Sequence, residues 1–368
     1  MIIEINLLLY LFIGSNLLYF SLLGIVYTGL KRLNKKPANQ FQPKISIIIA
    51  ARNEESRIFL CLESLEKLEY EKDKFEIILV DDCSSDRTAE IIQSFCQRHS
   101  NWRLLQLQNK SSELRGKLNA LQEGVSISSG EIIFTTDSDC ILPKDWLRKM
   151  MPYFEAGVTM VLGHSLLVSG KGFFHRLQEF DNLFSAIVVA ALTKMGYAFS
   201  SIGRNMAYRS ITLESVGGFN SLKKFRSGDD IHLTDRFRTK AGKIDYCADP
   251  ETFVLTQPLK SKKEFLNQQI RKNSKTFIRS PSSMLLPIGL FAYHVLFLLF
   301  PIIFPHQFLL WLAFLCLKFI LEFTCLYNAA IIFKQKQLIP YLLFMQIIYP
   351  GYIIFLTILG GLQVYKWK

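Results

Sequence analysis

The sequence lacks the glycine-rich loops with which many proteins hold the phosphates of a nucleotide. No Gly-x-Gly-x-x-Gly motif follows any apolar run that could form a strand, and no P-loop lysine motif is present. The seven cysteines are scattered, without a Cys-x-x-Cys pair or the spacing of a metal site. These absences disfavour a dinucleotide-binding fold and a P-loop enzyme. The scattered spacing of the cysteines predicts reduced thiols in core or lipid-facing positions.

Charged residues are missing from three long stretches. Asp, Glu, Lys and Arg are absent from Leu7 to Leu30, from Met284 to Leu317 and from Gln337 to Tyr365. A helix needs about 20 apolar residues to cross a bilayer, so these stretches are candidate membrane spans. The C-terminal spans are expected at Met284–Phe304, Gln307–Ile332 and Leu338–Leu362.

The first stretch also lacks the marks of a cleaved signal peptide, namely a basic region before it and a small-residue cleavage site. We therefore expect an uncleaved anchor in residues 1–36. Its basic flank, Lys31–Lys36, predicts by the positive-inside rule that the next domain is cytoplasmic. The expected organisation is this anchor, a cytoplasmic domain at 37–281 and about three helices at 282–368, in a multi-pass protein of the cell (inner) membrane. The basic end Lys366–Lys368 leaves an interfacial or re-entrant last segment as an alternative.

Acidic residues are scarce in the densest basic segment. Between Lys260 and Arg279 only Glu264 carries a negative charge, and the second apolar block follows directly. Such a segment is attracted to anionic lipid. The net charge of +12 comes without a basic platform interleaved with aromatic residues. We therefore predict a bilayer partner and no nucleic acid.

The part between the apolar blocks alternates strand and helix patterns. Near-continuous apolar runs at Ile45–Ala50 and Phe75–Val80 are typical of strands buried on both faces of a parallel sheet. Leu104–Leu107 and the run that begins at Ile132 continue the series, with amphipathic helical patterns between them. This order predicts an α/β fold with a doubly wound, mostly parallel sheet.

Carboxylates follow these strands where the chain leaves the sheet. Asp137 and Asp139 end the run Glu131–Asp139, and Asp81 and Asp82 end the second strand. The carboxyl ends of parallel strands share one rim, where open α/β sheets hold ligands. An Asp-x-Asp pair there suits Mg²⁺ or Mn²⁺ carrying a diphosphate. The alternatives are an acidic turn at the first pair and helix capping at the second.

Two later segments add to the pattern. Leu183–Leu192 is apolar but too short to span, so we expect a helix against the membrane or under the active site. Asp229 and Asp230 open a helical pattern after Gly228. The helix dipole alone would favour acids there, which is the alternative to a catalytic role.

In their order and spacing, these segments resemble the membrane-anchored family 2 glycosyltransferases of GT-A fold, a branch shared with bacterial polysaccharide synthases and ceramide glucosyltransferases. The resemblance runs from about Ser46 to Arg271. Ile47–Glu54 is similar to the opening strand and nucleotide loop of the family, which assigns Asn53 and Glu54 to the donor nucleotide.

The resemblance assigns the other site residues segment by segment. The segment Val80–Asp86 resembles the uridine-binding stretch, with Asp82 as base or ribose contact, and Arg115–Ala120 resembles the stretch whose lysine, Lys117, reaches the donor. Asp137 and Asp139 match the metal-binding signature, which makes Mg²⁺ or Mn²⁺ the implied cofactor. The acceptor side would include Asn205, Gln268 and Arg271, and the acidic pair Asp229 and Asp230 would carry the catalytic base.

Two positions depart from the family pattern. Asp229 stands where the family usually has glutamate, and Lys272 stands where tryptophan would stack against an acceptor sugar. The family chemistry is an inverting single displacement, in which a hydroxyl attacks a nucleotide-sugar and the diphosphate leaves. We predict a UDP-sugar donor and a lipid or lipid-linked acceptor. One alternative is a subunit of a processive polysaccharide synthase, which could act alone, as a homo-oligomer or with a partner subunit. The other two are a metal-dependent nucleotidyltransferase and a non-catalytic membrane scaffold.

Overall fold

The computed structural model describes residues 2–35, 37–38, 41–108, 114, 116–225, 228–240, 242–275 and 281–362. Arg115, Arg279 and Lys366–Lys368, which the sequence analysis singles out, lie outside the described residues. The chain divides into two compact units. The first comprises Met1–Lys31, Lys171–Ala191 and Leu259–Lys368, and the second comprises Arg32–Gly170 and Leu192–Pro258.

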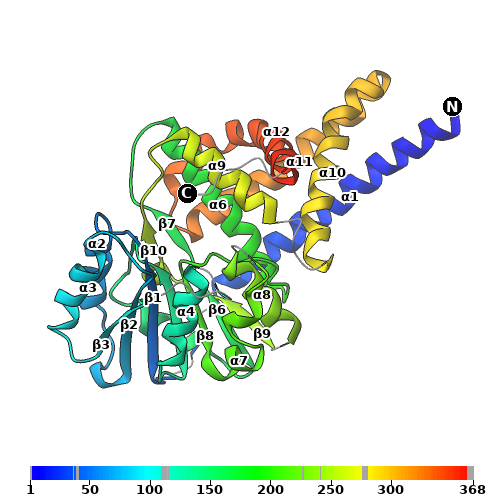
Figure 1. Cartoon of the computed structure of the whole chain (residues 1–368). Helices are drawn as coiled ribbons and strands as arrows, with labels where there is room; N and C mark the ends of the chain where they lie inside the picture. The colour runs from blue at the N-terminus through cyan, green and yellow to red at the C-terminus, as the bar shows by residue number, and fades with distance from the viewer. Residues whose placement is uncertain are drawn as a thin grey trace. The chain divides into compact units, whose positions relative to one another are not determined.

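A seven-stranded sheet forms the centre of the second unit, in the order β3-β2-β1-β4-β8-β6-β9 (Figure 1). Its strands are β1 (Ile45–Ala51), β2 (Phe75–Asp81), β3 (Trp102–Gln106), β4 (Ile132–Asp137), β6 (Val158–Leu162), β8 (Met206–Arg209) and β9 (Lys243–Tyr246). The strands from β3 to β4 run parallel, β8 is antiparallel to both β4 and β6, and β6 and β9 are again parallel. The predicted α/β fold with a mostly parallel sheet is therefore confirmed.

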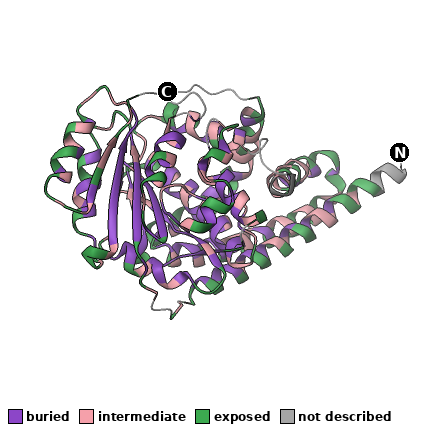
Figure 2. Ribbon diagram, turned by 60° about the horizontal axis from the view of Figure 1, so that its bottom comes forward, coloured by how far each residue is buried: buried purple, intermediate pink, exposed green. Residues whose placement is uncertain are grey.

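The central strands are buried, as their purple ribbons in Figure 2 show, because both faces of the sheet carry apolar side chains. Ile47, Ile77 and Phe134 are each 0% exposed, as expected of strands covered on both faces. Burying a side chain of this size stabilises the fold by about 1.5 to 3 kcal/mol. The connecting helices are α2 (Ile58–Glu66), α3 (Thr88–Cys96), α4 (Lys117–Ser126), α5 (Trp146–Met150), α7 (Ser210–Ser215) and α8 (Asp229–Lys240).

A second sheet of three strands includes the residues that directly follow the Asp-x-Asp segment. It has the order β5-β10-β7, with β5 (Cys140–Ile141), β7 (Ser165–Leu167) and β10 (Val254–Thr256). The strand β5 begins directly after Asp139 and pairs antiparallel with β10. The backbone that follows the acidic pair is therefore fixed by hydrogen bonds to a strand from much later in the chain.

The first unit is helical. It holds α1 (Ile2–Leu33), most of α6 (Phe173–Lys194), α9 (Lys262–Ser274), α10 (Pro281–Ile303), α11 (Phe308–Ile332) and α12 (Leu342–Gly361). Four described segments are long and apolar enough to cross a membrane, at Leu7–Leu33, Met284–Ile303, Pro305–Ile332 and Lys336–Gly361. They coincide with the four expected spans to within a few residues.

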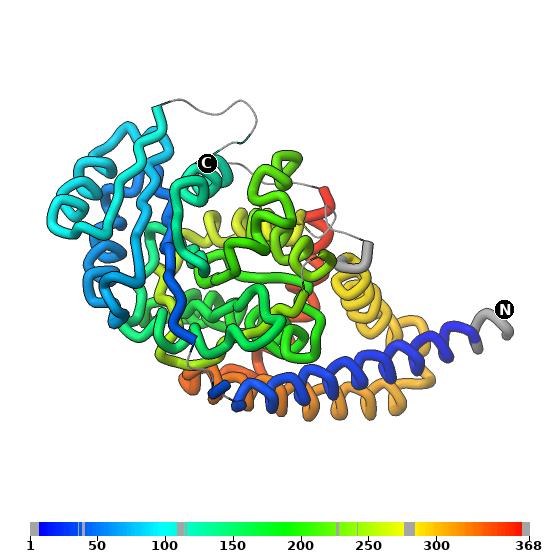
Figure 3. The backbone as a smooth tube through the Cα atoms, turned by 90° about the horizontal axis from the view of Figure 1, so that it is seen from below, coloured from blue at the N-terminus to red at the C-terminus, as the bar shows by residue number. Residues whose placement is uncertain are grey.

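Long-range contacts join these helices within the first unit. Figure 3 shows α1 running beside α11, where Phe12 meets Phe314 edge-on at 5.5 Å and Cys325 Sγ donates to the Leu23 carbonyl at 3.7 Å. The helix α6 begins ten residues before the short apolar stretch and belongs with this unit up to Ala191. The expected 37–281 boundaries, by contrast, place α6 and α9 with the catalytic domain.

Candidate active site

The site lies at the carboxyl edge of the sheet, where β1, β2 and β4 end side by side. Ala51 on β1 pairs with Asp81 on β2, and Ala50 pairs with Asp137 on β4. Both acidic segments therefore leave the sheet from strands next to β1. The two acidic segments therefore share one rim of the sheet, as predicted.

Hydrogen bonds join the loop after β1 to the loop after β2. The backbone N–H of Asn53 donates to Ser84 Oγ at 3.0 Å, and Asn53 Oδ1 accepts from the N–H of Ser85 at 2.8 Å. The N–H of Glu54 donates to Thr88 Oγ1 at 2.8 Å. Asn53 has a φ of 53°, a left-handed conformation that asparagine adopts more readily than most residues. The residues predicted to hold the nucleotide thus form one fixed loop pair.

Asp82 lies at the base of this loop pair. It is 4% exposed, and its Oδ2 accepts from Arg52 Nη1 at 3.3 Å. The neighbouring Asp81 accepts from the N–H of Ser84 through Oδ2 at 3.2 Å, while its buried Oδ1 has no partner among the described residues. Asp82 is positioned next to the nucleotide loop, and its contact with a base or ribose stays a prediction.

Lys117 connects two acidic segments of the site. Its Nζ lies 2.5 Å from Asp137 Oδ1 and 3.7 Å from Asp229 Oδ2. Burial alone would lower the pKa of Lys117, but Asp137 and Asp229 outweigh it and raise the pKa well above the usual range. The ammonium group therefore stays charged at every physiological pH.

Asp137 is held on both of its oxygens. Lys117 contacts Oδ1, and Arg204 Nε lies 3.7 Å from Oδ2. Burial would raise the pKa of Asp137, yet Lys117 and Arg204 together lower it, so the carboxylate is ionised. Arg204 reaches this place because its own carbonyl accepts from Thr136 Oγ1 at 2.7 Å.

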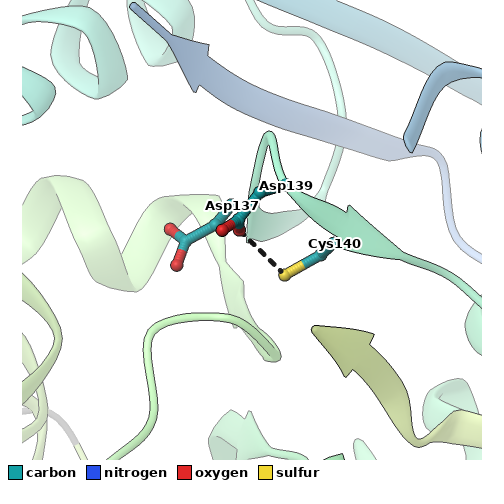
Figure 4. Close-up of side chains that lie close together, drawn as sticks. All are labelled: Asp137, Asp139 and Cys140. Carbon is teal, nitrogen blue, oxygen red and sulfur yellow. Dashed lines mark hydrogen bonds between the residues drawn. The ribbon is translucent and has the colours of Figure 1, made fainter. Parts of the chain in front are cut away.

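Asp137, Asp139 and Cys140 form the described cluster with metal-ligand geometry. One ligand atom from each residue lies within 4.8 Å of the others, and Figure 4 shows the three side chains close together. Cys140 Sγ donates to Asp139 Oδ1 at 3.7 Å, and burial followed by the two aspartates raises the pKa of its thiol far above the usual range. A protonated, soft thiol is a poor ligand for Mg²⁺ or Mn²⁺, so the donor set reduces to the two carboxylates.

The two aspartates fit a hard divalent cation. Carboxylate oxygens are the ligands that Mg²⁺ and Mn²⁺ prefer, and such ions take one or two of them from the protein. Asp139 is the more available, since its Oδ2 has only a loose ion pair with Arg57 at 3.9 Å. Burial, Asp139 and Asp137 raise the pKa of the nearby Glu54, which shows how strongly negative this corner is before a cation enters.

Asp230 lies in the first turn of α8 and approaches the loop before β8. Its Oδ2 accepts from the N–H of Gly203 at 3.0 Å, and its Oδ1 accepts from the N–H of Ile231 at 2.9 Å. A β-carbon on Gly203 would lie 3.2 Å from Asp230 Cβ, so an alanine there would force a small shift of one of the two residues. Asp229 faces Lys117 instead. The acidic pair therefore divides into one residue tied to the lysine and one held by backbone N–H groups.

Asn205, which the resemblance assigns to the acceptor side, is buried and hydrogen-bonded within the second unit. It is 0% exposed, and its amide accepts from Trp146 Nε1 at 2.9 Å while donating to the carbonyls of His164 and Thr252, each at 2.8 Å. These bonds fix the Gly203–Arg209 segment against the rest of the second unit. Contact between Asn205 and an acceptor stays a prediction, and the bonds give this residue a holding role.

Gln268 and Arg271 lie on α9, in the first unit, whereas the acidic residues belong to the second. Both are half-buried, and the neighbouring Gln269 is the buried glutamine, donating to Asp181 Oδ2 at 2.8 Å. The acceptor-side role of Gln268 and Arg271 stays a prediction.

Sequence reasoning missed the arginines of the site. Arg52, Arg57 and Arg204 contact Asp82, Asp139 and Asp137 respectively. Arg52 stands inside the predicted nucleotide loop Ile47–Glu54 and Arg204 directly precedes the predicted Asn205, and the excess of acids at the rim is itself a signal for cations there. Arg57 has no such signal.

Comparison with known proteins places this geometry in a family. The family model for glycosyl transferase family 2 matches residues 46–216. A beta-monoglucosyldiacylglycerol synthase from Synechocystis sp. is 28% identical over 56% of this chain, and the match spans 43% of the length of that protein. Glycosyltransferase AglE from Haloferax volcanii is 28% identical over 62% of this chain and 71% of its own.

The structure of mannosyltransferase PcManGT from Pyrobaculum calidifontis, determined with GDP-Man and Mn²⁺, resembles this chain with a TM-score of 0.59. The sequences are 19% identical, and the likeness covers 97% of each chain, so it shows a shared fold. Residues 46–216 are therefore similar to family 2 glycosyltransferase domains, and the chain shares the fold of a solved glycosyltransferase.

Proposed function

We propose that the protein transfers a sugar from a nucleotide-sugar, in particular a UDP-sugar, to a lipid or lipid-linked acceptor in a single inverting displacement. The observation that carries this proposal is the position of Lys117 between Asp137 and Asp229. Lys117 thereby places a positive charge for the leaving diphosphate next to the acidic pair that begins α8. Transfer of a sugar requires such a charge on the diphosphate side and a base on the acceptor side.

Asp230 is the proposed general base. An acceptor hydroxyl is a poor nucleophile, and a carboxylate within about 3 Å must take its proton as the new bond forms. The N–H of Gly203 and the N–H of Ile231 each donate to one oxygen of Asp230, which fixes the orientation of the carboxylate. Because no protein nucleophile takes part, one displacement inverts the anomeric configuration.

Lys117 and Arg204 are the proposed stabilisers of the leaving group. Both contact Asp137 and carry charge toward the site where negative charge builds on the diphosphate. Asp139, with Asp137, would hold Mg²⁺ or Mn²⁺, which when bound supplies further charge neutralisation of the diphosphate. Asn53 and Glu54 shape the loop for the nucleotide, and Asp82 is the proposed base or ribose contact.

The lipid acceptor is supported by the first unit. Four helices there are long and apolar enough to cross a membrane, and one relative is named for the diacylglycerol lipid that it makes. We place the second unit in the cytoplasm, because the basic residues Lys31, Arg32 and Lys35 lie at the C-terminal end of the N-terminal span. An acceptor in the same bilayer needs no diffusion through water.

A pair of variants tests the roles of metal ligand and base. Asp139→Asn should abolish metal-dependent binding of the donor, measured by calorimetry with and without Mn²⁺. Asp230→Asn should bind the donor as the wild type does and lose transfer by at least about 100-fold, as expected when a general base is removed. Asp73→Asn, at an exposed acid of the same unit, is the matched control.

Loss of donor binding in Asp230→Asn would contradict its role as base. Nucleotide release then separates the classes of enzyme. UDP-sugars, GDP-sugars and dTDP-sugars are compared with nucleoside triphosphates, each with Mn²⁺. Turnover of triphosphates without turnover of any nucleotide-sugar would identify a nucleotidyltransferase and overturn the proposal.

A further inference from the structure

The first unit contains a cavity of about 70 Å³ that the proposed transfer does not use. Its walls come from α1, α6, α10, α11 and α12, all within this unit, and are mostly apolar. A cavity of about 150 Å³ is known to hold benzene, so this one admits the end of a molecule rather than a whole lipid. The wall includes Leu23, Val26, Phe184, Leu290, Pro350 and Ile353.

The ion pair between Lys318 and Glu322 at the cavity carries no net charge. Glu322 Oε1 lies 2.7 Å from Lys318 Nζ and accepts from the hydroxyl of Tyr19 at 2.5 Å, while Gln346 Nε2 donates to Glu322 Oε2 at 3.3 Å. The Lys318 side chain is 2% exposed. Because the pair is compensated, an anionic group would bring an unbalanced charge into an apolar place, which costs far more than entry of a neutral group.

Gln346 and His294 offer hydrogen-bond acceptors at this cavity. Gln346 Oε1 is buried and has no partner in the described part of the chain. Pro350 has no N–H, so the backbone carbonyl of Gln346 also loses its usual helical donor. His294 Nδ1 lies 2.7 Å from the Leu290 carbonyl and must be the donor, which leaves Nε2 as an acceptor in the neutral ring.

We infer that this cavity binds the hydroxyl end of a neutral membrane lipid, of the class of glycerolipids with a free hydroxyl. The hydroxyl donates to Gln346 Oε1 or His294 Nε2, and the carbons next to it contact the apolar wall. A small number of polar groups in an apolar concave site is typical of lipid-sized ligands. The inference does not require this lipid to be the sugar acceptor, so its test is independent of the proposed function.

Photolabelling of the full chain in phosphatidylcholine nanodiscs tests the inference without any sugar donor. Two probes with the same diazirine-bearing acyl chains are compared, a diacylglycerol and a phosphatidic acid. We expect the diacylglycerol to label peptides of α10, α11 or α12 several-fold more than the phosphatidic acid does, with competition by unlabelled diacylglycerol.

Two variants locate the label. Gln346→Leu removes the acceptor and should weaken competition about fivefold, the usual effect of one hydrogen bond, while Ile353→Trp should fill the cavity and abolish the specific label. Thr324→Val removes an exposed hydroxyl on α11 and is the control. Size-exclusion profiles confirm that each variant is folded. Equal labelling by both probes would show that the cavity does not select a free hydroxyl, and labelling of Ile353→Trp at the wild-type level would show that the label does not come from the cavity; either result would overturn the inference.

Discussion

Lys117 is the residue on which the site depends. Its ammonium group is the contact shared by the strand-end carboxylate Asp137 and by Asp229 at the start of α8. Without it, two acidic segments would face each other with only Arg204 to offset Asp137. The same charge that holds the acids together is therefore available to a diphosphate when the donor binds.

Replacing Lys117 by glutamine should weaken donor binding. A charge-assisted hydrogen bond contributes about 1.5 to 3 kcal/mol, so we expect the KM for the nucleotide-sugar to rise about 10- to 100-fold. Steady-state kinetics with the donor varied measure this change, with Lys243→Gln at an exposed position as control. A normal KM in the Lys117 variant would show that the lysine serves structure alone.

Replacing Gly203 by alanine should impair the chemical step rather than binding. The backbone there accepts alanine, but the new methyl group would lie 3.2 Å from Asp230 Cβ and 3.4 Å from Oδ2. Misplacing a catalytic group by about 1 Å can cost about 100-fold in rate, so a smaller displacement of the base should still slow transfer. We expect a lower kcat with donor affinity unchanged, measured by rapid-quench kinetics and calorimetry; equal losses in both would argue for a folding defect.

The acids of the site could be predicted from the sequence and most of their partners could not. Asp137 and Asp139 end an apolar run, so their place at the sheet rim follows from local pattern. The contact of Arg204 with Asp137 depends on β8 pairing with β4, which joins residues far apart along the chain. The burial of Asn205 likewise follows from three distant partners that no local motif encodes.

At the scale of elements, β2 is tied to its neighbours through Glu76. This residue is 4% exposed, accepts from Ser46 Oγ and from the N–H and hydroxyl of Ser129, and pairs with Arg103 at 2.8 Å. Burial would raise the pKa of Glu76, but the bonds to Ser46 and Ser129 and the charge of Arg103 lower it overall. A carboxylate thus links β1, β2, β3 and the turn before β4.

Glu76→Gln should destabilise the protein in a pH-dependent way. A lowered folded-state pKa stabilises the fold above the ordinary value of 4.5, and that contribution is lost as pH falls through the folded-state pKa. We expect a loss of about 1 to 3 kcal/mol at pH 7 that shrinks below about pH 4.5. Thermal unfolding of wild type and variant between pH 3 and 7 measures it; a difference independent of pH would contradict the role of the charge.

The first four strands and their helices were predictable because each is a continuous apolar or amphipathic run. The bounds of these strands agree with the expected ones to within two or three residues. The later strands β6, β8 and β9 have four or five residues each and were not predicted. The antiparallel direction of β8 is a property of chain topology, which a periodic pattern does not carry.

At the scale of the whole molecule, the product of the reaction is the property most open to test. A channel for a growing polysaccharide must be walled by enough helices to enclose a hydrated chain, because lipid cannot satisfy sugar hydroxyls. The described chain offers four segments able to cross a membrane, one of them near the N-terminus. Lys272, where the family has tryptophan, also removes a stacking platform for acceptor sugars.

We therefore expect the purified protein, given a UDP-sugar and a membrane extract, to make products of one or a few sugars that partition into organic solvent. Thin-layer chromatography and mass spectrometry of both phases measure this outcome, with Asp230→Asn as the inactive control. The length of the product separates two mechanisms, since a lipid acceptor leaves after transfer whereas a polymer must remain bound between transfers. A long water-soluble polymer made by this chain alone, or by its homo-oligomer, would contradict single transfer while leaving the glycosyltransferase chemistry of the second unit intact.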